Sequence, residues 1–268
     1  MAKKYNFDEL LEKEKENFKK NWIKAPDLKN LDEGNVKKVL KMALNATLNH
    51  KVAHQVSDEE FYDPFVKEYI NFATNNINDK NDFEKEFERF IENYQIRIKK
   101  CGVQKADNFG YAQKFVSLSF KLIYCFNDKK IKESNFQYCK MIIDKYTLNW
   151  YFTIGEEETK AKFMKNNKNK AWSKIEKENY ETIQKEIEEY IENKGLYQVE
   201  CWENGEKIEL SGNVFESEFI IWEQEQLNEI YKKLKKKSHN IERIVKYKLF
   251  KFCDTNDIIK IWKTRKQV

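Results

Sequence analysis

Glycine and proline, the residues that most often interrupt helices, are scarce in this sequence, with seven glycines and two prolines among 268 residues. So few turn-forming residues favour helices joined by short Asn-, Asp- and Lys-rich loops over a β-rich architecture. Apolar residues also recur at helical spacing in most segments, most clearly over 7–18, 36–44, 61–72 and 83–94. We therefore predict a mainly α, multi-helix globular bundle, a single domain spanning 1–268 that also divides into two lobes of about 1–105 and 106–268 around a cleft.

One segment departs from the helical pattern. Apolar residues alternate from Tyr197 to Cys201, the chain reaches Asn204-Gly205, and the alternation resumes at Ile208. An Asn-Gly pair between two alternating runs is a strong hairpin signal. We expect one small β-hairpin near 196–211.

The bulk charge places few limits on function. Fifty basic and 45 acidic residues give a net charge of +5, so nucleic acid is an allowed partner but not a required one. The five cysteines are an odd number and widely spaced, which indicates reduced thiols in an intracellular protein. No stretch approaches the roughly 18 apolar residues of a membrane span, and we expect a cytoplasmic protein with no membrane partner.

The segment GYAQKFVSLSFKLIYCF, residues 110–126, is unusually apolar for a chain in which 35% of residues are charged. As a helix it is apolar around nearly its whole circumference, which is typical of a buried helix. Lys114, Ser117 and Lys121 share its one narrow polar stripe. Desolvation disfavours an ammonium group, so a lysine here is a candidate amine nucleophile; the alternative is a lysine whose head group snorkels to water.

The next apolar run, residues 138–152, holds a single carboxylate, Asp144. We interpret Asp144 as the N-cap of a helix, with Ile143 and Leu148 at the two positions of a hydrophobic staple. First-turn amides stabilise a carboxylate at such a position. Asp144 is then either a structural cap alone or a base or electrostatic partner for a nearby lysine.

Several common sites are not predicted. The sequence contains no Walker A loop, no G-x-G-x-x-G, no G-x-S-x-G and no paired C-x-x-C. His50 and His54 have the spacing of two metal ligands on a helix, but Lys51 stands where the zincin motif needs glutamate. We expect no metal and no cofactor.

The elements Gln113-Lys114 and Ile143-Asp144-Lys145-Tyr146 together resemble the active-site motifs of helix-hairpin-helix base-excision DNA glycosylases. The likeness is to the archaeal-type 8-oxoguanine DNA glycosylases, in which a Q-K-T helix with a second downstream lysine precedes a P-[VIL]-D-Y/H-R helix start. It covers about fifty residues. The family's proline is Ile142 here, and no G-x-G hairpin precedes the lysine. The chain also resembles an uncharacterised bacterial family in the A-W-S-K of 171–174 and the Tyr/Ile-rich helix that follows.

The resemblance implies a helix-hairpin-helix glycosylase-like fold and a catalytic pair. Lys114 would be the nucleophile and Asp144 the activating carboxylate, although spacing alone does not choose between Lys114 and Lys121. A flipped-out base would occupy an aromatic pocket, for which the candidate tryptophans are Trp22, Trp150, Trp172 and Trp222. Further candidate residues for binding nucleic acid or substrate are Gln113, Lys121, Lys145, Trp150 and Trp172.

The leading hypothesis is therefore a DNA glycosylase or glycosylase/lyase that acts on a damaged or modified base. Two other classes stay open. One is a non-catalytic protein on a glycosylase-like fold, with a protein or nucleic-acid partner and a role in phage–host conflict. The other is an enzyme that acts on free nucleosides or nucleotides, which suits the weak net charge.

Overall fold

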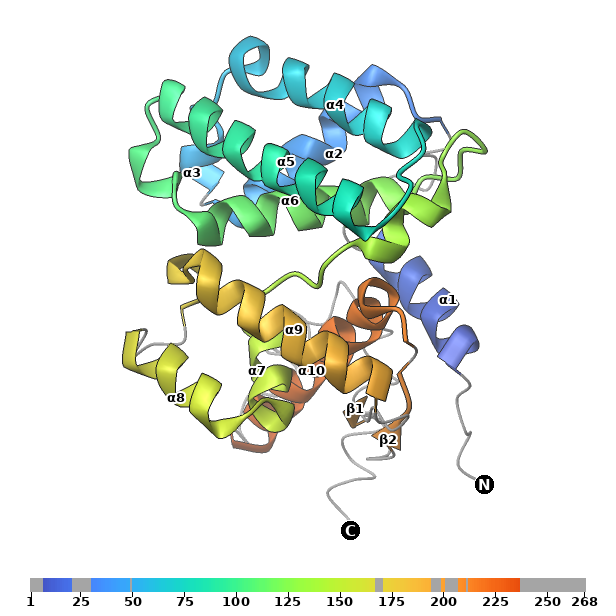
Figure 1. The fold of residues 1–268 in the computed structure, drawn as a ribbon, viewed down its shortest axis with the longest axis vertical. Helices are drawn as coiled ribbons and strands as arrows, with labels where there is room; N and C mark the ends of the chain where they lie inside the picture. Colours follow the sequence, from blue (N-terminus) through green and yellow to red (C-terminus); the bar gives the residue numbers. More distant parts are fainter. Residues whose placement is uncertain are drawn as a thin grey trace.

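The computed structural model describes residues 7–20, 30–48, 50–166, 171–193, 199–200, 207–210 and 212–236. These ranges are mainly helical, which confirms the predicted α class (Figure 1). The first six helices are α1 (Phe7–Phe18), α2 (Glu33–Thr47), α3 (His50–Ala53), α4 (Asp63–Thr74), α5 (Lys80–Lys100) and α6 (Phe109–Tyr124). The other four are α7 (Lys145–Ile154), α8 (Glu157–Asn166), α9 (Lys177–Asn193) and α10 (Val214–Lys236). No helix in the described ranges has the length and apolarity needed to cross a membrane.

Short helical turns connect some of these helices. A π-helical turn covers Asp58–Tyr62, and 3-10 turns cover Gln104–Ala106, Glu133–Tyr138 and Trp172–Lys174. Ser57 caps the π-helical turn, and α4 then begins at Asp63 with a proline at its first positions. Proline is tolerated there because the first-turn amides of a helix have no intrahelical partner.

Two very short strands pair antiparallel, β1 (Val199–Glu200) with β2 (Lys207–Ile208). Their register places Val199 opposite Ile208. The predicted Asn204-Gly205 turn lies outside the described residues, as do Trp22 and the segment 237–268.

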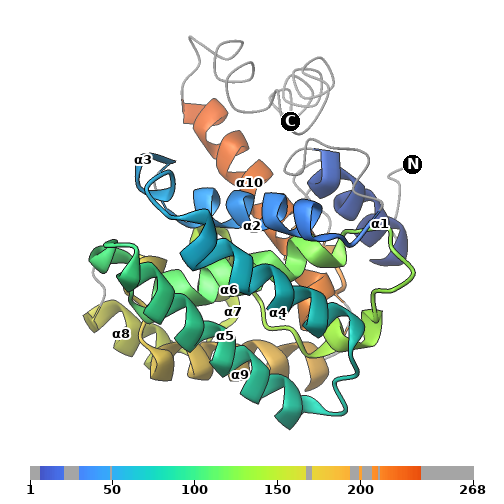
Figure 2. The ribbon, with the colours of Figure 1, turned by 90° about the horizontal axis from the view of Figure 1, so that it is seen from above.

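Helix α6 lies at the centre of the bundle and packs against α2 and α5 (Figure 2). Its buried Phe115 and Phe120 contact aromatic rings of α4 and α5: the ring centroids of Phe115 and Phe65 are 5.4 Å apart, and those of Phe120 and Phe90 are 5.3 Å apart. Nearly every residue from Ala112 to Ile123 is buried. The prediction of a buried helix is therefore confirmed.

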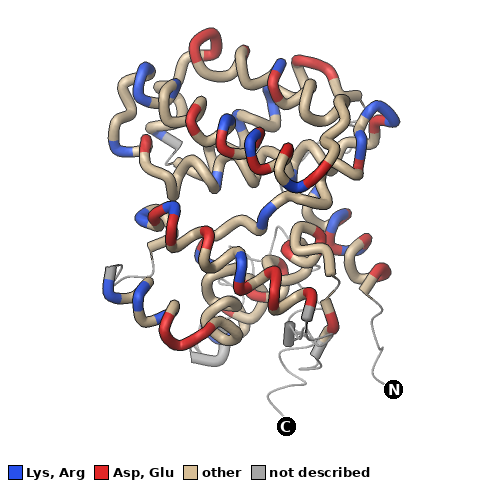
Figure 3. Tube along the Cα trace, in the orientation of Figure 1, with Lys and Arg blue, Asp and Glu red and all other residues tan. Residues whose placement is uncertain are grey.

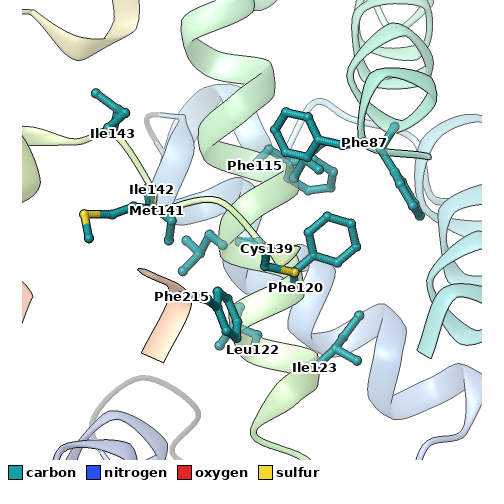
Figure 4. Packing of buried hydrophobic residues seen from close by; sticks show 14 of the residues in the cluster. Phe87, Phe115, Phe120, Leu122, Ile123, Cys139, Met141, Ile142, Ile143 and Phe215 are labelled. Atoms are coloured by element: carbon teal, nitrogen blue, oxygen red, sulfur yellow. The ribbon is translucent and has the colours of Figure 1, made fainter. Parts of the chain in front are cut away.

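The chain crosses the molecule between α6 and α7. In Figure 1, α2 to α6 form one group of helices and α7 to α10 another, with the extended segment 139–144 passing between them. Met141, Ile142 and Ile143 are buried along this segment, beside α6 (Figure 4). The segment thus carries the chain to Asp144 at the place where the two groups meet.

The connection from α5 to α6 is tight because of Gly102, whose φ is +78°. The amide of Gly102 donates to the carbonyl of Lys99, and that of Val103 donates to the carbonyl of Ile98. This is the Schellman arrangement, in which a residue with left-handed backbone ends a helix. Because α5 ends there, α6 can return directly along it.

Candidate functional site

Asp144 caps the N-terminus of α7. Its Oδ1 accepts from the amides of Tyr146 at 2.8 Å and Thr147 at 3.3 Å, while its own amide donates to Thr147 Oγ1 at 2.8 Å. The reciprocal bonds make a capping box, and the buried Ile143 and Leu148 occupy the staple positions. The predicted cap is confirmed, and it fixes the direction of the carboxylate.

Lys114 lies opposite this carboxylate. Its Nζ is 3.5 Å from Asp144 Oδ2, and the side chains are only 14% and 7% exposed. Oδ2 also accepts a hydrogen bond from Trp222 Nε1 of α10 at 3.1 Å. Two backbone amides, one indole and one amine therefore converge on the two oxygens of Asp144.

Gln113 explains how two helices from different parts of the chain bring this pair together. Its amide Nε2 donates to the carbonyl of Ile143 at 2.8 Å, and its Oε1 accepts from the amide of Ile143 at 3.3 Å. Gln113 is completely buried. Because it precedes Lys114, and Ile143 precedes Asp144, this double hydrogen bond sets the register of the two neighbouring residues.

Trp172 covers Lys114. The amine Nζ lies 4.3 Å from the centroid of the Trp172 ring, within the range of a cation–π interaction. The turn that carries Trp172 packs directly on the first turn of α6, where a Cβ at Gly110 would come within 2.7 Å of the carbonyl oxygens of Trp172 and Ser173. A residue without a side chain at 110 is therefore needed to bring the indole over the amine.

The second lysine of the stripe has a different role. Lys121 is 1% exposed, so the snorkelling interpretation is wrong for it: burial under α1 and α10 leaves the head group no path to water. Its Nζ lies 2.7 Å from Glu218 Oε1 and 4.2 Å from the ring centroid of Phe219. The two charged groups are therefore in direct contact as a buried ion pair. Burial raises the pKa of the Glu218 carboxyl, and Lys121 opposes that shift.

The remaining predicted site residues are dispersed. Lys145 is exposed at the start of α7 and pairs with Glu229 at 2.5 Å. Trp150 is 2% exposed and packs edge-to-face on Tyr190, with 6.1 Å between their centroids. Among the described residues, the ion pair and the cation–π contact of Lys114 are with Asp144 and Trp172, whereas Trp150 is enclosed in the core.

Two partners were not assigned from the sequence. Trp222 appears there only as one of several tryptophans, and the structure makes it a hydrogen-bond donor to Asp144. Glu218 gives no sequence signal beyond its place in an apolar stretch, yet it pairs with Lys121. An acidic residue within an apolar, buried stretch does predict that a cationic partner lies nearby, because an unpaired buried charge is costly. It does not predict which cation that is.

A groove of about 660 Å³ lies between α5 and α9. Neither Lys114 nor Asp144 lines it. Within the described residues, no group of three or more His, Cys, Asp or Glu side chains is placed to hold a metal ion. The site is therefore a compact amine–carboxylate pair beneath an indole.

No protein-family model, no curated protein and no solved structure matches this chain.

Proposed function

We propose that this protein is a DNA glycosylase, or glycosylase/lyase, in which Lys114 attacks the sugar of a damaged or modified nucleotide and Asp144 assists. The observation that carries the proposal is the 3.5 Å contact between Lys114 Nζ and Asp144 Oδ2, between side chains that are 14% and 7% exposed. The resemblance in the motifs around both residues supports the same assignment.

The chemistry needs only groups that these two residues supply. The bond from C1′ of the sugar to the base breaks, and the departing base takes the electron pair. The neutral amine of Lys114 attacks C1′, while the Asp144 carboxylate stabilises the positive charge that develops on the sugar. One proton of the attacking nitrogen neutralises the departed base. The C1′–O4′ bond of the sugar then breaks with its electron pair on O4′, which takes the second nitrogen proton, and the resulting Schiff base between Lys114 and C1′ permits strand cleavage by β-elimination.

In the free protein, Lys114 Nζ contacts both the Asp144 carboxylate and the Trp172 ring. Before Lys114 can attack, binding of the flipped nucleotide has to move Nζ away from at least one of these two partners. We propose that Trp172 moves from the amine to the face of the base, since stacking on an aromatic side chain is a common way to hold an extruded base.

DNA backbone contacts fit the turn between α5 and α6. Lys99, Lys100 and Lys105 are exposed there, next to the first turn of the helix that carries Lys114. Lysines at such a turn neutralise phosphates and make binding dependent on salt. This tight connection would take the place of the family's G-x-G hairpin.

A second candidate is a non-catalytic binding protein on the same fold. Trp172 covers the amine, and the groove between α5 and α9 lies elsewhere; both observations favour this alternative. A protein that stays bound to a protein partner, and that retains no nucleic acid after a salt wash, would support it. Activity on free nucleosides would instead appear as base release without any DNA.

Borohydride trapping on DNA duplexes that carry different modified bases tests the proposal. The wild type should form a covalent complex with at least one of them, and Lys114→Arg should form none, because a guanidinium keeps the positive charge but cannot form this Schiff base. Lys85→Ala is the control, since Lys85 is exposed on α5 and its amine lies 3.9 Å from Asp82 Oδ1. Equal trapping by the wild type and Lys114→Arg on every duplex would overturn the assignment.

A further inference from the structure

The groove between α5 and α9, called here the α5–α9 groove, is separate from the Lys114–Asp144 site. Its floor is formed by Phe87, Ile91, Phe109 and Tyr180. The rings of Phe87 and Tyr180 stack with 6.3 Å between centroids and 6° between planes, and Phe109 meets Tyr180 edge-on at 5.2 Å. Its volume of about 660 Å³ is within the range of 300–1,000 Å³ that is usual for ligand sites.

The two helices that form its walls run antiparallel and are tied across the groove. Lys80, at the start of α5, pairs with Glu188 near the end of α9, while Glu88 pairs with Lys177 at the start of α9, each at 2.6 Å. Charged residues of both signs follow each other along these helices (Figure 3). The groove therefore has fixed walls and an apolar, aromatic floor.

The residues that line the groove carry an excess of negative charge. They include four lysines and seven glutamates, which gives a net charge of −3. Each lysine already has a glutamate partner: Lys80 with Glu188, Lys177 with Glu88, Lys140 with Glu84 and Lys185 with Glu189. Among the described residues, Glu92 and Glu192 have no cation within ion-pair distance, and Glu181 shares Lys177 at 3.8 Å.

These charges decide what the groove can accept. Excess carboxylates repel a nucleic-acid backbone and attract cations. The acidic residues also extend along the walls: Glu84 to Glu92 covers about 12 Å of α5 and Glu181 to Glu192 about 16 Å of α9, at 1.5 Å per residue. An occupant should carry several positive charges over that length.

We propose that the α5–α9 groove binds a lysine- or arginine-rich segment of a partner protein. About five residues of extended chain span 16 Å. In such a chain alternate side chains point to opposite faces, so apolar ones can meet Phe87 and Tyr180 while the basic ones reach the glutamates. A thin alkylamine of equal length would satisfy the charges but leave most of the volume empty.

Fluorescence anisotropy with a labelled hexapeptide of alternating lysine and leucine tests this proposal, with the glutamate–leucine peptide as the negative probe. The triple variant Glu92→Gln, Glu181→Gln and Glu192→Gln should weaken binding of the basic peptide by about ten-fold. Lys185→Gln, which frees Glu189, should tighten it by about two- to three-fold. All four positions are exposed, so these changes leave the core intact.

The matched control is the triple variant Glu9→Gln, Glu59→Gln and Glu158→Gln, which changes the net charge equally at exposed positions outside the groove. It should bind as the wild type does. Equal weakening by the two triple variants would overturn the proposal in favour of general charge attraction. Displacement of the peptide by spermine at equal concentrations of charge would overturn it in favour of a small amine. Lys114→Arg should bind the peptide normally, so failure here is distinct from failure of the proposed glycosylase activity.

Discussion

The side chain of Gln113 pairs with the main chain of Ile143 through two hydrogen bonds, of 2.8 Å to its carbonyl and 3.3 Å from its amide. Gln184 of α9 makes the same kind of pair with Met141, at 2.6 Å and 3.3 Å. Two buried glutamines thus hold the crossing segment from opposite groups of helices. Only Gln113 is adjacent to the lysine that faces Asp144.

Replacing Gln113 by leucine should lower the free energy of unfolding by about 2–4 kcal/mol, because the polar main-chain groups of Ile143 lose their partner in the core. Gln184→Leu removes the matching pair at Met141 and should cost a similar amount. Urea denaturation measures both. If Gln113 positions the site, Gln113→Leu should also reduce borohydride trapping, while folded Gln184→Leu traps normally; equal trapping by the two variants would show that Gln113 is only structural.

Gly110→Ala should displace the Trp172 turn, since a Cβ there would lie 2.7 Å from main-chain atoms of 172 and 173. We expect a loss of about 1–3 kcal/mol from overpacking, reduced by the better helix propensity of alanine. Thermal unfolding measures the loss of stability, and near-ultraviolet circular dichroism reports the displacement of Trp172. Gly212→Ala is the control, because among the described residues no atom beyond its chain neighbours lies within 4 Å of a Cβ at that position; identical behaviour of the two variants would contradict the packing described.

Lys121 and Glu218 form a fully buried ion pair, so either one alone should be hard to remove. Lys121→Met or Glu218→Leu should each destabilise the protein by about 3–5 kcal/mol, since each leaves one charge uncompensated. The double variant should recover most of that loss. A double-mutant cycle from chemical denaturation gives the coupling energy, and additive losses would mean that the two groups do not act as a pair.

The buried Glu223 makes stability depend on pH. Burial, and then the charge of Glu14, raise its pKa to about 8, while Lys121 and Lys13 oppose the shift. The folded protein therefore holds a proton that the unfolded chain releases above about pH 4.5, and stability should fall as pH rises from about 5 to 8. The fall should be on the order of a few kcal/mol, and Glu223→Gln should flatten it. An unchanged slope in Glu223→Gln would assign the proton to another group.

Local features of the site could be predicted from the sequence. The burial of α6 follows from apolar residues around its whole circumference, and the cap at Asp144 follows from the spacing of Ile143, Asp144 and Leu148. Both depend on residues close together in the chain. The proximity of Lys114 and Asp144 was suggested only by the likeness of their flanking motifs.

Features that join distant parts of the chain could not be predicted in this way. Glu218 meets Lys121 across 97 residues of sequence, and no periodicity within α6 or α10 specifies that contact. Trp172 reaches Lys114 only because Gly110 lets a 3-10 turn approach the helix. The α5–α9 groove likewise arises from the relative placement of two helices, each of which appears as an ordinary amphipathic helix by itself.

The most direct test of the central claim is to locate the modified lysine in a borohydride-trapped complex with DNA. After proteolysis and nuclease digestion, mass spectrometry should find the sugar remnant on Lys114 in the peptide that contains Gln113 and Phe115. A remnant on an exposed lysine such as Lys105 or Lys174, or no trapped complex with any modified duplex, would contradict the assignment of Lys114 as the nucleophile.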